Sequence, residues 1–186
     1  MTQRRYRRGP DRATGLGLPD ARRGGYTRPV MSSSLGSALP PAILARLSQA
    51  DLAARLGRGL PLVTLAADGI PHPMLTSYLE WLAVDAQTLR LAIAAGSRSA
   101  RNLEERRVAT LLLIEPALTV YVKCRAEAGP LRLGDLARFT LRVEDVLEDA
   151  PAEGEGAVRI TAGISYAPAP ALEEAWARAV LGVLRA

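Results

Sequence analysis

Short apolar segments of alternating polarity recur along most of this chain, and turn-forming residues separate them. A period of two is typical of half-buried β-strands, and Asp68-Gly69 between two such segments is a strong hairpin signal. Strands joined by tight turns, without regular alternation with helices, predict an antiparallel barrel or sandwich rather than a doubly wound sheet. We expect six or seven strands, at residues 60–67, 70–84, 88–95, 108–115, 119–126, 136–146 and 157–164, with an acidic surface loop over residues 144–155.

Helices are expected only at the periphery of this mainly β (α+β) fold. Pro40-Pro41 precedes a helical apolar pattern, and a second short helix should end before Gly57. Leu172 to Leu184 has apolar residues at helical spacing, which predicts an amphipathic helix with Trp176 in core or dimer packing. No apolar stretch reaches the roughly 18 residues that a membrane span requires.

Positive charge is concentrated at the N-terminus. The formal net charge is +5, but residues 1–30 contain eight arginines and two aspartates, so the rest of the chain carries −1. This balance argues against a nucleic-acid-binding domain and leaves only non-specific phosphate contacts by the tail. We predict a disordered Arg-rich tail over residues 1–37 and one domain over residues 38–186. Met31 offers an alternative start, which would make the preceding residues a start-site artefact; without a secretory signal, we expect a cytoplasmic protein.

The chain contains one cysteine, Cys124, and one histidine, His72. A single cysteine excludes an intrachain disulfide, and these counts exclude thiolate clusters and paired-histidine metal sites. A Ser-His-Asp triad would need His72, which lies between two prolines at the start of a predicted strand and is interpreted as a surface imidazole. We therefore assign no metal ligand and no catalytic side chain.

The segment Gly96 to Leu103 combines small residues, hydroxyl groups and two arginines at a predicted strand-to-helix turn. Small residues let backbone N–H groups approach a phosphate, the helix N-terminus adds partial positive charge, and arginine supplies a planar fork of donors. The segment therefore predicts an anion site. A structural interpretation is also open, in which Ser97 or Ser99 only caps the helix and the two arginines are solvated.

Several segments between Leu60 and Ala126 resemble, in order and spacing, the FMN-binding split barrel of the pyridoxamine 5′-phosphate oxidase-like proteins. They are Asp68-Gly69, Pro71-His72-Pro73, Gly96 to Leu103, Val108 to Leu112 and Tyr121 to Ala126. The resemblance implies an antiparallel split β-barrel with peripheral helices. It also implies a homodimer that binds FMN in a cleft between its two subunits.

The same resemblance implies which residues bind the cofactor. The turn after the third strand would hold the phosphate, and the second and third strands would carry the flavin ring, largely through main-chain contacts. The matching residues are Ser97, Arg98, Ser99, Arg101 and Asn102 for the phosphate, and Met74, Thr76, Ser77, Ala92 and Ile93 for the ring. Ser99 stands where a lysine is usual, so either Arg101 replaces that charge or flavin affinity is lower or lost.

The C-terminal helix contains only Arg178 and Arg185 and lacks the basic cluster that grips the substrate phosphate in true pyridoxamine phosphate oxidases. We therefore expect an FMN-binding oxidoreductase that transfers hydride to or from another small planar substrate. Because a flavin carries its own redox chemistry, no catalytic side chain is required. Deazaflavin and haem are alternative cofactors within the family. The alternative function is a cofactor-free split-barrel dimer that serves as a binding module.

Overall fold

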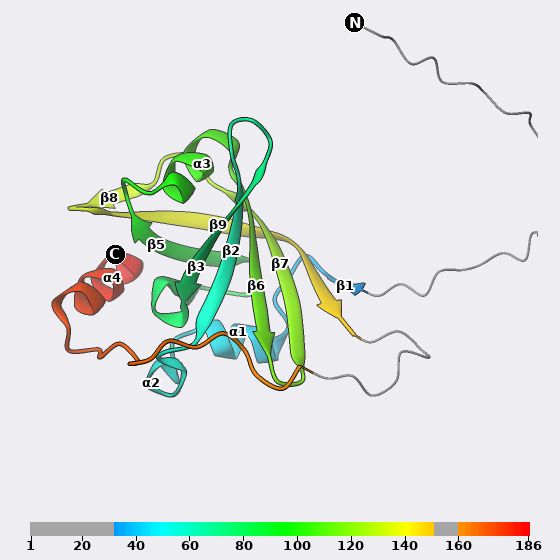
Figure 1. The fold of residues 1–186 in the computed structure, drawn as a ribbon. Coiled ribbons are helices and arrows are strands. Elements are labelled where there is room, and N and C mark those ends of the chain that lie inside the picture. The colour runs from blue at the N-terminus through cyan, green and yellow to red at the C-terminus, as the bar shows by residue number, and fades with distance from the viewer. Residues whose placement is uncertain (1–31, 151–159) are drawn as a thin grey trace, which may run out of the picture.

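The computed structural model describes residues 32–150 and 160–186, which form a nine-stranded antiparallel sheet with helices around it (Figure 1). The strands are β1 (Ser32–Gly36), β2 (Gly59–Leu65), β3 (Pro71–Ser77), β4 (Trp81–Ala83), β5 (Thr88–Ala94), β6 (Val108–Glu115), β7 (Leu118–Ala126), β8 (Leu131–Leu133) and β9 (Leu136–Asp149). The helices are α1 (Pro41–Leu47), α2 (Leu52–Arg55), α3 (Arg98–Arg106) and α4 (Ala175–Arg185), with a 3₁₀ turn, η1 (Tyr78–Glu80).

The order of the strands shows that the sheet is curled. Its main path runs β3-β2-β6-β7-β9-β5-β4, and β1 and β8 pair with β9. On a flat sheet β3 and β4 would lie roughly 29 Å apart, at about 4.8 Å per strand. The chain joins these two edge strands through η1 alone, and the path from Ser77 to Trp81 spans at most about 14 Å. The two edges therefore approach each other, which confirms the predicted antiparallel split barrel.

β9 holds the sheet together because it pairs with four other strands. β8 and β7 lie along one of its edges, and β5 and β1 lie along the other. The strand expected to end at residue 146 overlaps the acidic loop expected over residues 144–155; β9 continues to Asp149, so the strand is confirmed through residue 146 and the loop is wrong over residues 144–149. Their charges lie on its outer side, where Glu144 pairs with Arg125 at 2.6 Å and Asp145 pairs with Lys123 at 3.4 Å on β7.

Two further expectations differ at the start of the domain. Residues 32–36, assigned to the disordered tail, form β1 and pair with β9, whereas residues 1–31 of that tail lie outside the described residues. The second predicted strand, residues 70–84, is divided into β3, η1 and β4. A capping box between Ser77 and Glu80 starts a helical turn inside that segment and so interrupts the strand.

The seventh predicted strand is not formed. Residues 160–164 have no strand conformation, and residues 157–159 lie outside the described part of the chain. The β2–β6 ladder covers only residues 62–64 and 109–111, and the segment passes between these two strands beyond that ladder, with Gly163 against Ile114 O, without forming a ladder of its own. The segment makes only isolated backbone contacts at the start of β2, through an Arg58–Ser165 bridge.

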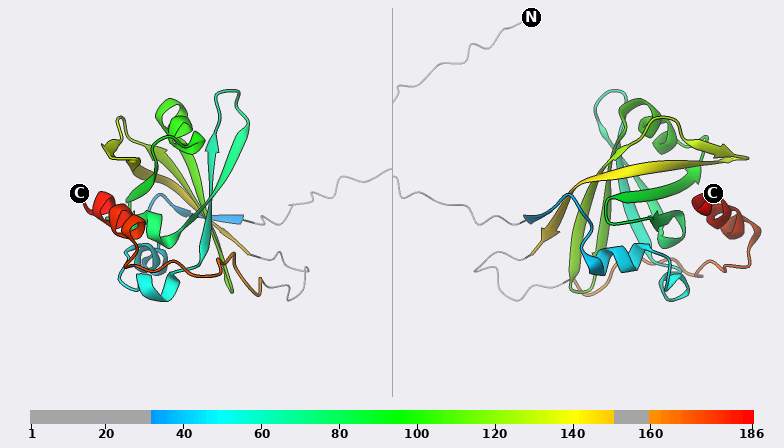
Figure 2. Two further views of the ribbon diagram at one scale, coloured as in Figure 1. Left: turned by 60° about the vertical axis from the view of Figure 1, so that its left-hand side comes forward. Right: turned by 180° about the vertical axis from the view of Figure 1, so that it is seen from behind.

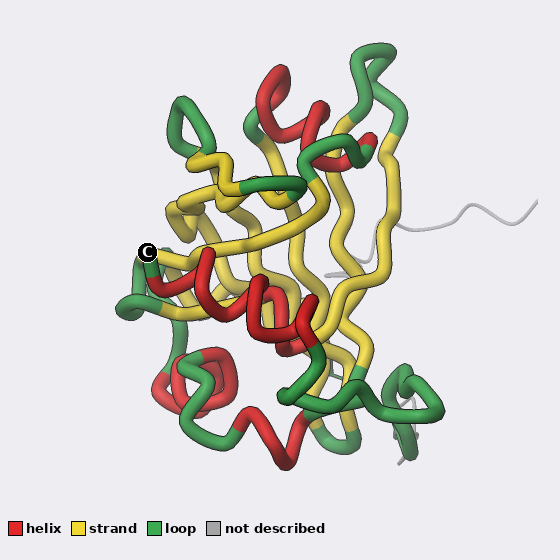
Figure 3. The backbone as a smooth tube through the Cα atoms, turned by 90° about the vertical axis from the view of Figure 1, so that its left-hand side faces the viewer, coloured by secondary structure: helices red, strands yellow, loops and turns green. Residues whose placement is uncertain are grey.

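Alternate strand residues face inward and build the core. Leu111 and Leu113 on β6, Leu89 and Leu91 on β5, and Phe139 on β9 are all buried. α3 packs against β2 and β6 at one end of the barrel, while α1 and α2 lie toward the opposite end (Figure 2). α4 lies across the sheet against β5, β9 and η1 (Figure 3). Among the described residues, the helices are too short or too polar to cross a membrane.

Candidate functional site

The turn between β5 and α3 carries the residues predicted from the sequence to bind an anion. Ser97 caps α3: its Oγ accepts a hydrogen bond from Ala100 N at 3.1 Å, and its carbonyl oxygen accepts one from Arg101 N at 3.3 Å. In the described ranges, the N–H groups of Arg98 and Ser99 have no protein acceptor, and the first turn contains no acidic residue. The helix N-terminus therefore presents two free amides and partial positive charge.

The five predicted phosphate-binding residues lie together but do different things. Arg98 and Arg101 are exposed, whereas Ser99 and Asn102 are buried, with exposed fractions of 1% and 4%. Asn102 Nδ2 donates to Thr64 Oγ1 at 2.9 Å, which ties α3 to β2. Ser99 Oγ is buried and has no hydrogen-bond partner among the described residues. Two guanidinium groups are thus available to an anion, and one hydroxyl in the same turn is unused.

The predicted ring-binding residues do not form one open surface. Ala92 and Ile93 are buried, and Met74 is half-buried. Thr76 is also buried, and its Oγ1 donates to Leu60 O at 2.6 Å while accepting from the Trp81 indole at 2.9 Å. The fold therefore already uses the Thr76 hydroxyl, and a ligand could meet this position only through its main chain.

Ser77 is engaged in the capping box of η1. Its N–H donates to Glu80 Oε2 at 2.8 Å, its hydroxyl bonds the same oxygen, and its Oγ accepts from Leu79 N at 3.3 Å. Burial raises the pKa of Glu80, and the bonds from Ser77 partly offset that rise. The η1 corner thus carries its own carboxylate, whereas the α3 corner does not.

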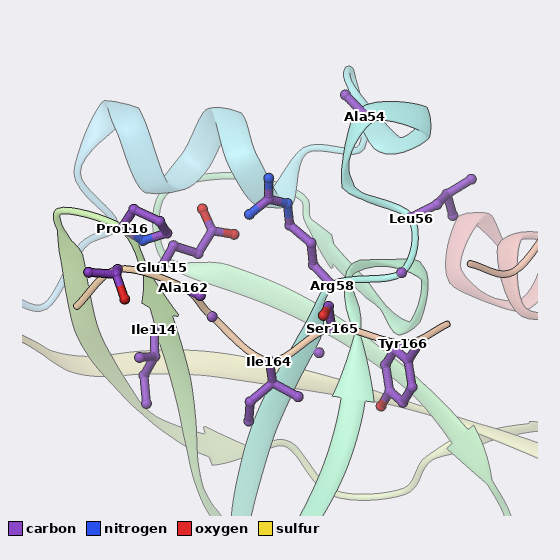
Figure 4. Close-up of a pocket in the computed structure, with 14 residues that line it drawn as sticks. Ala54, Leu56, Arg58, Ile114, Glu115, Pro116, Ala162, Ile164, Ser165 and Tyr166 are labelled. Carbon is purple, nitrogen blue, oxygen red and sulfur yellow. The ribbon is translucent and has the colours of Figure 1, made fainter. Parts of the chain in front are cut away.

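A pocket of about 460 Å³ lies between the start of β2, the end of β6 and the C-terminal segment (Figure 4). Glu115, only 6% exposed, lines it: its Oε1 accepts from Tyr78 OH at 2.7 Å and its Oε2 from Arg46 Nη1 at 2.5 Å. Burial first, and then the Glu115 carboxylate, raise the pKa of Tyr78. The Arg55 guanidinium lies 5.4 Å from the centre of the Tyr78 ring. Both Glu115 oxygens are engaged, so this cluster stabilises the fold and offers no free base.

The alternation of β6 predicts this buried carboxylate, although Glu115 is not among the expected site residues. Glu115 follows Leu111 and Leu113 at a spacing of two, so strand alternation places it on the inward face of β6. The C-terminal segment closes the pocket through two backbone hydrogen bonds, from Gly59 N to Ile164 O at 2.8 Å and from Tyr166 N to Gly57 O at 2.6 Å.

No protein-family model matches this sequence, and no curated protein matches it. Solved structures do show a likeness. A pyridoxamine 5′-phosphate oxidase-like protein from Lactobacillus delbrueckii is 15% identical, with a TM-score of 0.49 over 61% of this chain and 97% of that one. An FMN-binding protein from Syntrophomonas wolfei is 10% identical, with a TM-score of 0.47 over 59% and 88%. The haem storage protein HutZ from Vibrio cholerae is 17% identical, with a TM-score of 0.45 over 63% and 98%.

The chain is a split barrel. That assignment depends on its own strand order and on the short η1 link between the two edge strands.

Proposed function

We propose that this chain binds FMN, or a closely related phosphorylated flavin, at the N-terminus of α3 and acts as a flavin-dependent oxidoreductase. The observation that supports this most directly is the free N-terminal turn of α3, where the amides of Arg98 and Ser99 lack acceptors among the described residues. A phosphate group fits such a turn because it accepts several N–H bonds and complements the helix dipole.

The side chains of the turn fit the same ligand. Arg98 and Arg101 are exposed next to the free amides, and no carboxylate in the first turn competes for them. Ser99 contributes its backbone amide, which is free within the described ranges, while its side chain is buried between α3 and the sheet and makes no contact with the open face of the turn. When bound, the flavin ring would supply hydride transfer, and the protein would position it.

The ring would lie toward β3 and β5, as the sequence resemblance implies. Since the Thr76 and Ser77 hydroxyls are engaged and Ala92 and Ile93 are buried, we infer that the main chain and the half-buried Met74 make these contacts. The proposal includes a homodimer whose second subunit completes the cleft, and sedimentation equilibrium tests that part separately.

A titration with FMN tests the proposal. The purified chain should quench FMN fluorescence saturably, and Arg98→Gln and Arg101→Gln should each weaken binding about tenfold, the effect of losing one charge-assisted hydrogen bond. Arg107→Asn is the matched control, because it removes one positive charge at the opposite end of α3, where a left-handed backbone suits asparagine.

Equal affinity in all three variants, or no quenching by the parent chain, would contradict the proposal. The absence of flavin binding would favour the second candidate, a cofactor-free binding module, for which Ser99 in place of the usual lysine is the specific observation. Ser99→Lys is a poor way to restore binding, since the side chain at this position is buried and a lysine would have to leave the helix–sheet interface.

A further inference from the structure

A second pocket, of about 400 Å³, lies beside η1, where the C-terminal segment turns into α4. It contains two aromatic rings, two carboxylates and several small or proline residues, and no lysine or arginine lines it. The lining residues are Ser77, Glu80, Tyr166, Pro168, Ala169, Pro170, Glu174 and Trp176.

The aromatic rings of this pocket are unusually open. Trp176 is 45% exposed and Tyr166 is 37% exposed. The sequence places Trp176 on the packed face of α4, and Val180 and Val183 on that face are indeed buried. Trp176 lies in the first turn of α4, however, and lines the pocket instead of the core. An exposed indole in a concave site is more typical of ligand binding than of packing.

The two carboxylates have only neutral donors. Glu80 accepts from Ser77 N and Ser77 Oγ, and Glu174 accepts from Trp176 Nε1 at 2.5 Å and from Ala171 N at 3.3 Å. Neither has a cationic partner in the ranges that the structure describes. Two carboxylates therefore lie at one pocket without a cationic partner among the described residues, and Glu80 is half-buried.

The position of Tyr166 strengthens this picture. Its hydroxyl donates to Thr76 O at 3.3 Å, and its pKa is raised by burial first and by the charge of Glu80 second. The ring is thus held close to a carboxylate. Aromatic faces attract cations through their quadrupoles, and a nearby carboxylate adds to that attraction when solvent is displaced.

We propose that this pocket binds a small organic cation of the alkylammonium class, with the rings of Trp176 and Tyr166 flanking the cationic group and Glu80 and Glu174 neutralising its charge. The volume is of the order that small-molecule sites have. A metal ion fits less well, because the pocket offers aromatic and proline surfaces where a metal would need further oxygen ligands. The site uses none of the proposed phosphate-binding residues 97–102, but it shares Ser77 with the proposed flavin ring site.

Choline and 3,3-dimethylbutanol are the two probes, because they have the same shape and differ in charge. The chain has two tryptophans, of which Trp81 is buried, so a change in intrinsic fluorescence reports on Trp176. We expect choline to change the emission saturably and the neutral alcohol to bind at least about tenfold more weakly.

Three variants locate the binding. Glu174→Gln and Glu80→Gln should each weaken choline binding several-fold, and glutamine still accepts the hydrogen bonds of the η1 capping box. Glu173→Gln is the matched control, because this neighbouring exposed glutamate does not line the pocket. Trp176→Leu should abolish binding measured by calorimetry, with thermal unfolding as the check on folding.

The proposal is overturned if choline and the neutral alcohol bind equally, if neither binds, or if Glu173→Gln weakens binding as much as Glu174→Gln. Repeating the choline titration with FMN present keeps the two proposals apart. Choline binding without FMN binding would support this pocket and contradict the flavin site. FMN binding without choline binding would support the flavin site and contradict this pocket.

Discussion

The turns that follow β3 and β5 are both capped by a serine, but only the turn after β5 is free of acidic residues and can accept an anion. Each places a serine at the start of a helical turn, Ser77 before η1 and Ser97 before α3. Glu80 returns its carboxylate to the first of these corners and bonds Ser77. α3 has no acid in its first turn, so its amides stay open. The glutamate at position N3 of η1, Glu80, thus distinguishes a serine-capped turn that repels anions from one that can bind them.

The largest expected effect concerns Thr76, the residue before Ser77 at the η1 corner, which we call the closed corner because Glu80 occupies it; the α3 corner is the open one. Thr76→Val should lower the free energy of unfolding by about 2 kcal/mol, because the buried Trp81 indole loses its acceptor. FMN affinity of the folded variant should stay unchanged, since this hydroxyl serves the fold. Urea denaturation and an FMN titration measure the two quantities. A loss of affinity without a loss of stability would instead make Thr76 a ligand contact.

Ser97→Asp converts the open corner toward the closed type. Aspartate caps a helix as well as serine does, so the unfolding free energy should hold, but its charge should weaken FMN binding about tenfold, or about 1.4 kcal/mol. Isothermal calorimetry at low and high salt measures the change, which should shrink as salt screens the charge. Unchanged affinity at low salt would show that the anion site lies elsewhere.

Ser97→Ala separates capping from charge. Loss of the bond to Ala100 N should cost about 1 kcal/mol of stability. Hydrogen exchange should then increase in α3 first, while η1 keeps its protection. If α3 and η1 lost protection together, the two corners would unfold as one cooperative unit and would not be independent.

The smallest effect is a pH dependence at the closed corner. Because burial raises the pKa of Glu80, its folded state holds a proton more tightly than the unfolded state does. Its contribution to stability is therefore most favourable below the ordinary glutamate pKa of about 4.3 and declines as pH rises through the raised value. Glutamine does not titrate, so the free energy of unfolding of Glu80→Gln should rise relative to that of the parent chain as pH increases across that window. Urea titrations at several pH values measure this difference. Parallel pH profiles would contradict a raised pKa.

Much of the barrel could be predicted because its strands carry a clear period of two and its turns carry local signals. The prediction failed where pairing partners decide the outcome. Acidic residues 144–149 looked like a loop because the sequence does not show that Lys123 and Arg125 lie on the neighbouring strand. Residues 160–164 have strand-like alternation, but where the segment passes between the ends of β2 and β6 it forms only the isolated Arg58–Ser165 bridge. Tertiary context overrides local propensity in both cases.

The candidate site was predictable in its position and less so in its details. A small-residue turn with hydroxyls and arginines marks the α3 corner, and Ser97 does cap the helix. That Ser99 and Asn102 face the barrel depends on how α3 docks on β2, which the polar sequence of this helix conceals. The pocket with Glu80 and Trp176 joins segments almost one hundred residues apart, so no local pattern could reveal it.

Because four strands pair with β9, the sheet can close only after β9 has been synthesised. Until residue 149 has left the ribosome, β5 and β7 each expose a row of unpaired amides and carbonyls, and β1 has nothing to join. Such edges are templates for pairing with other chains, and closing them depends on contacts distant in sequence, which form slowly. A nascent chain that stalls before this point is therefore a natural client for chaperones, and a truncation there should yield aggregates rather than a smaller domain.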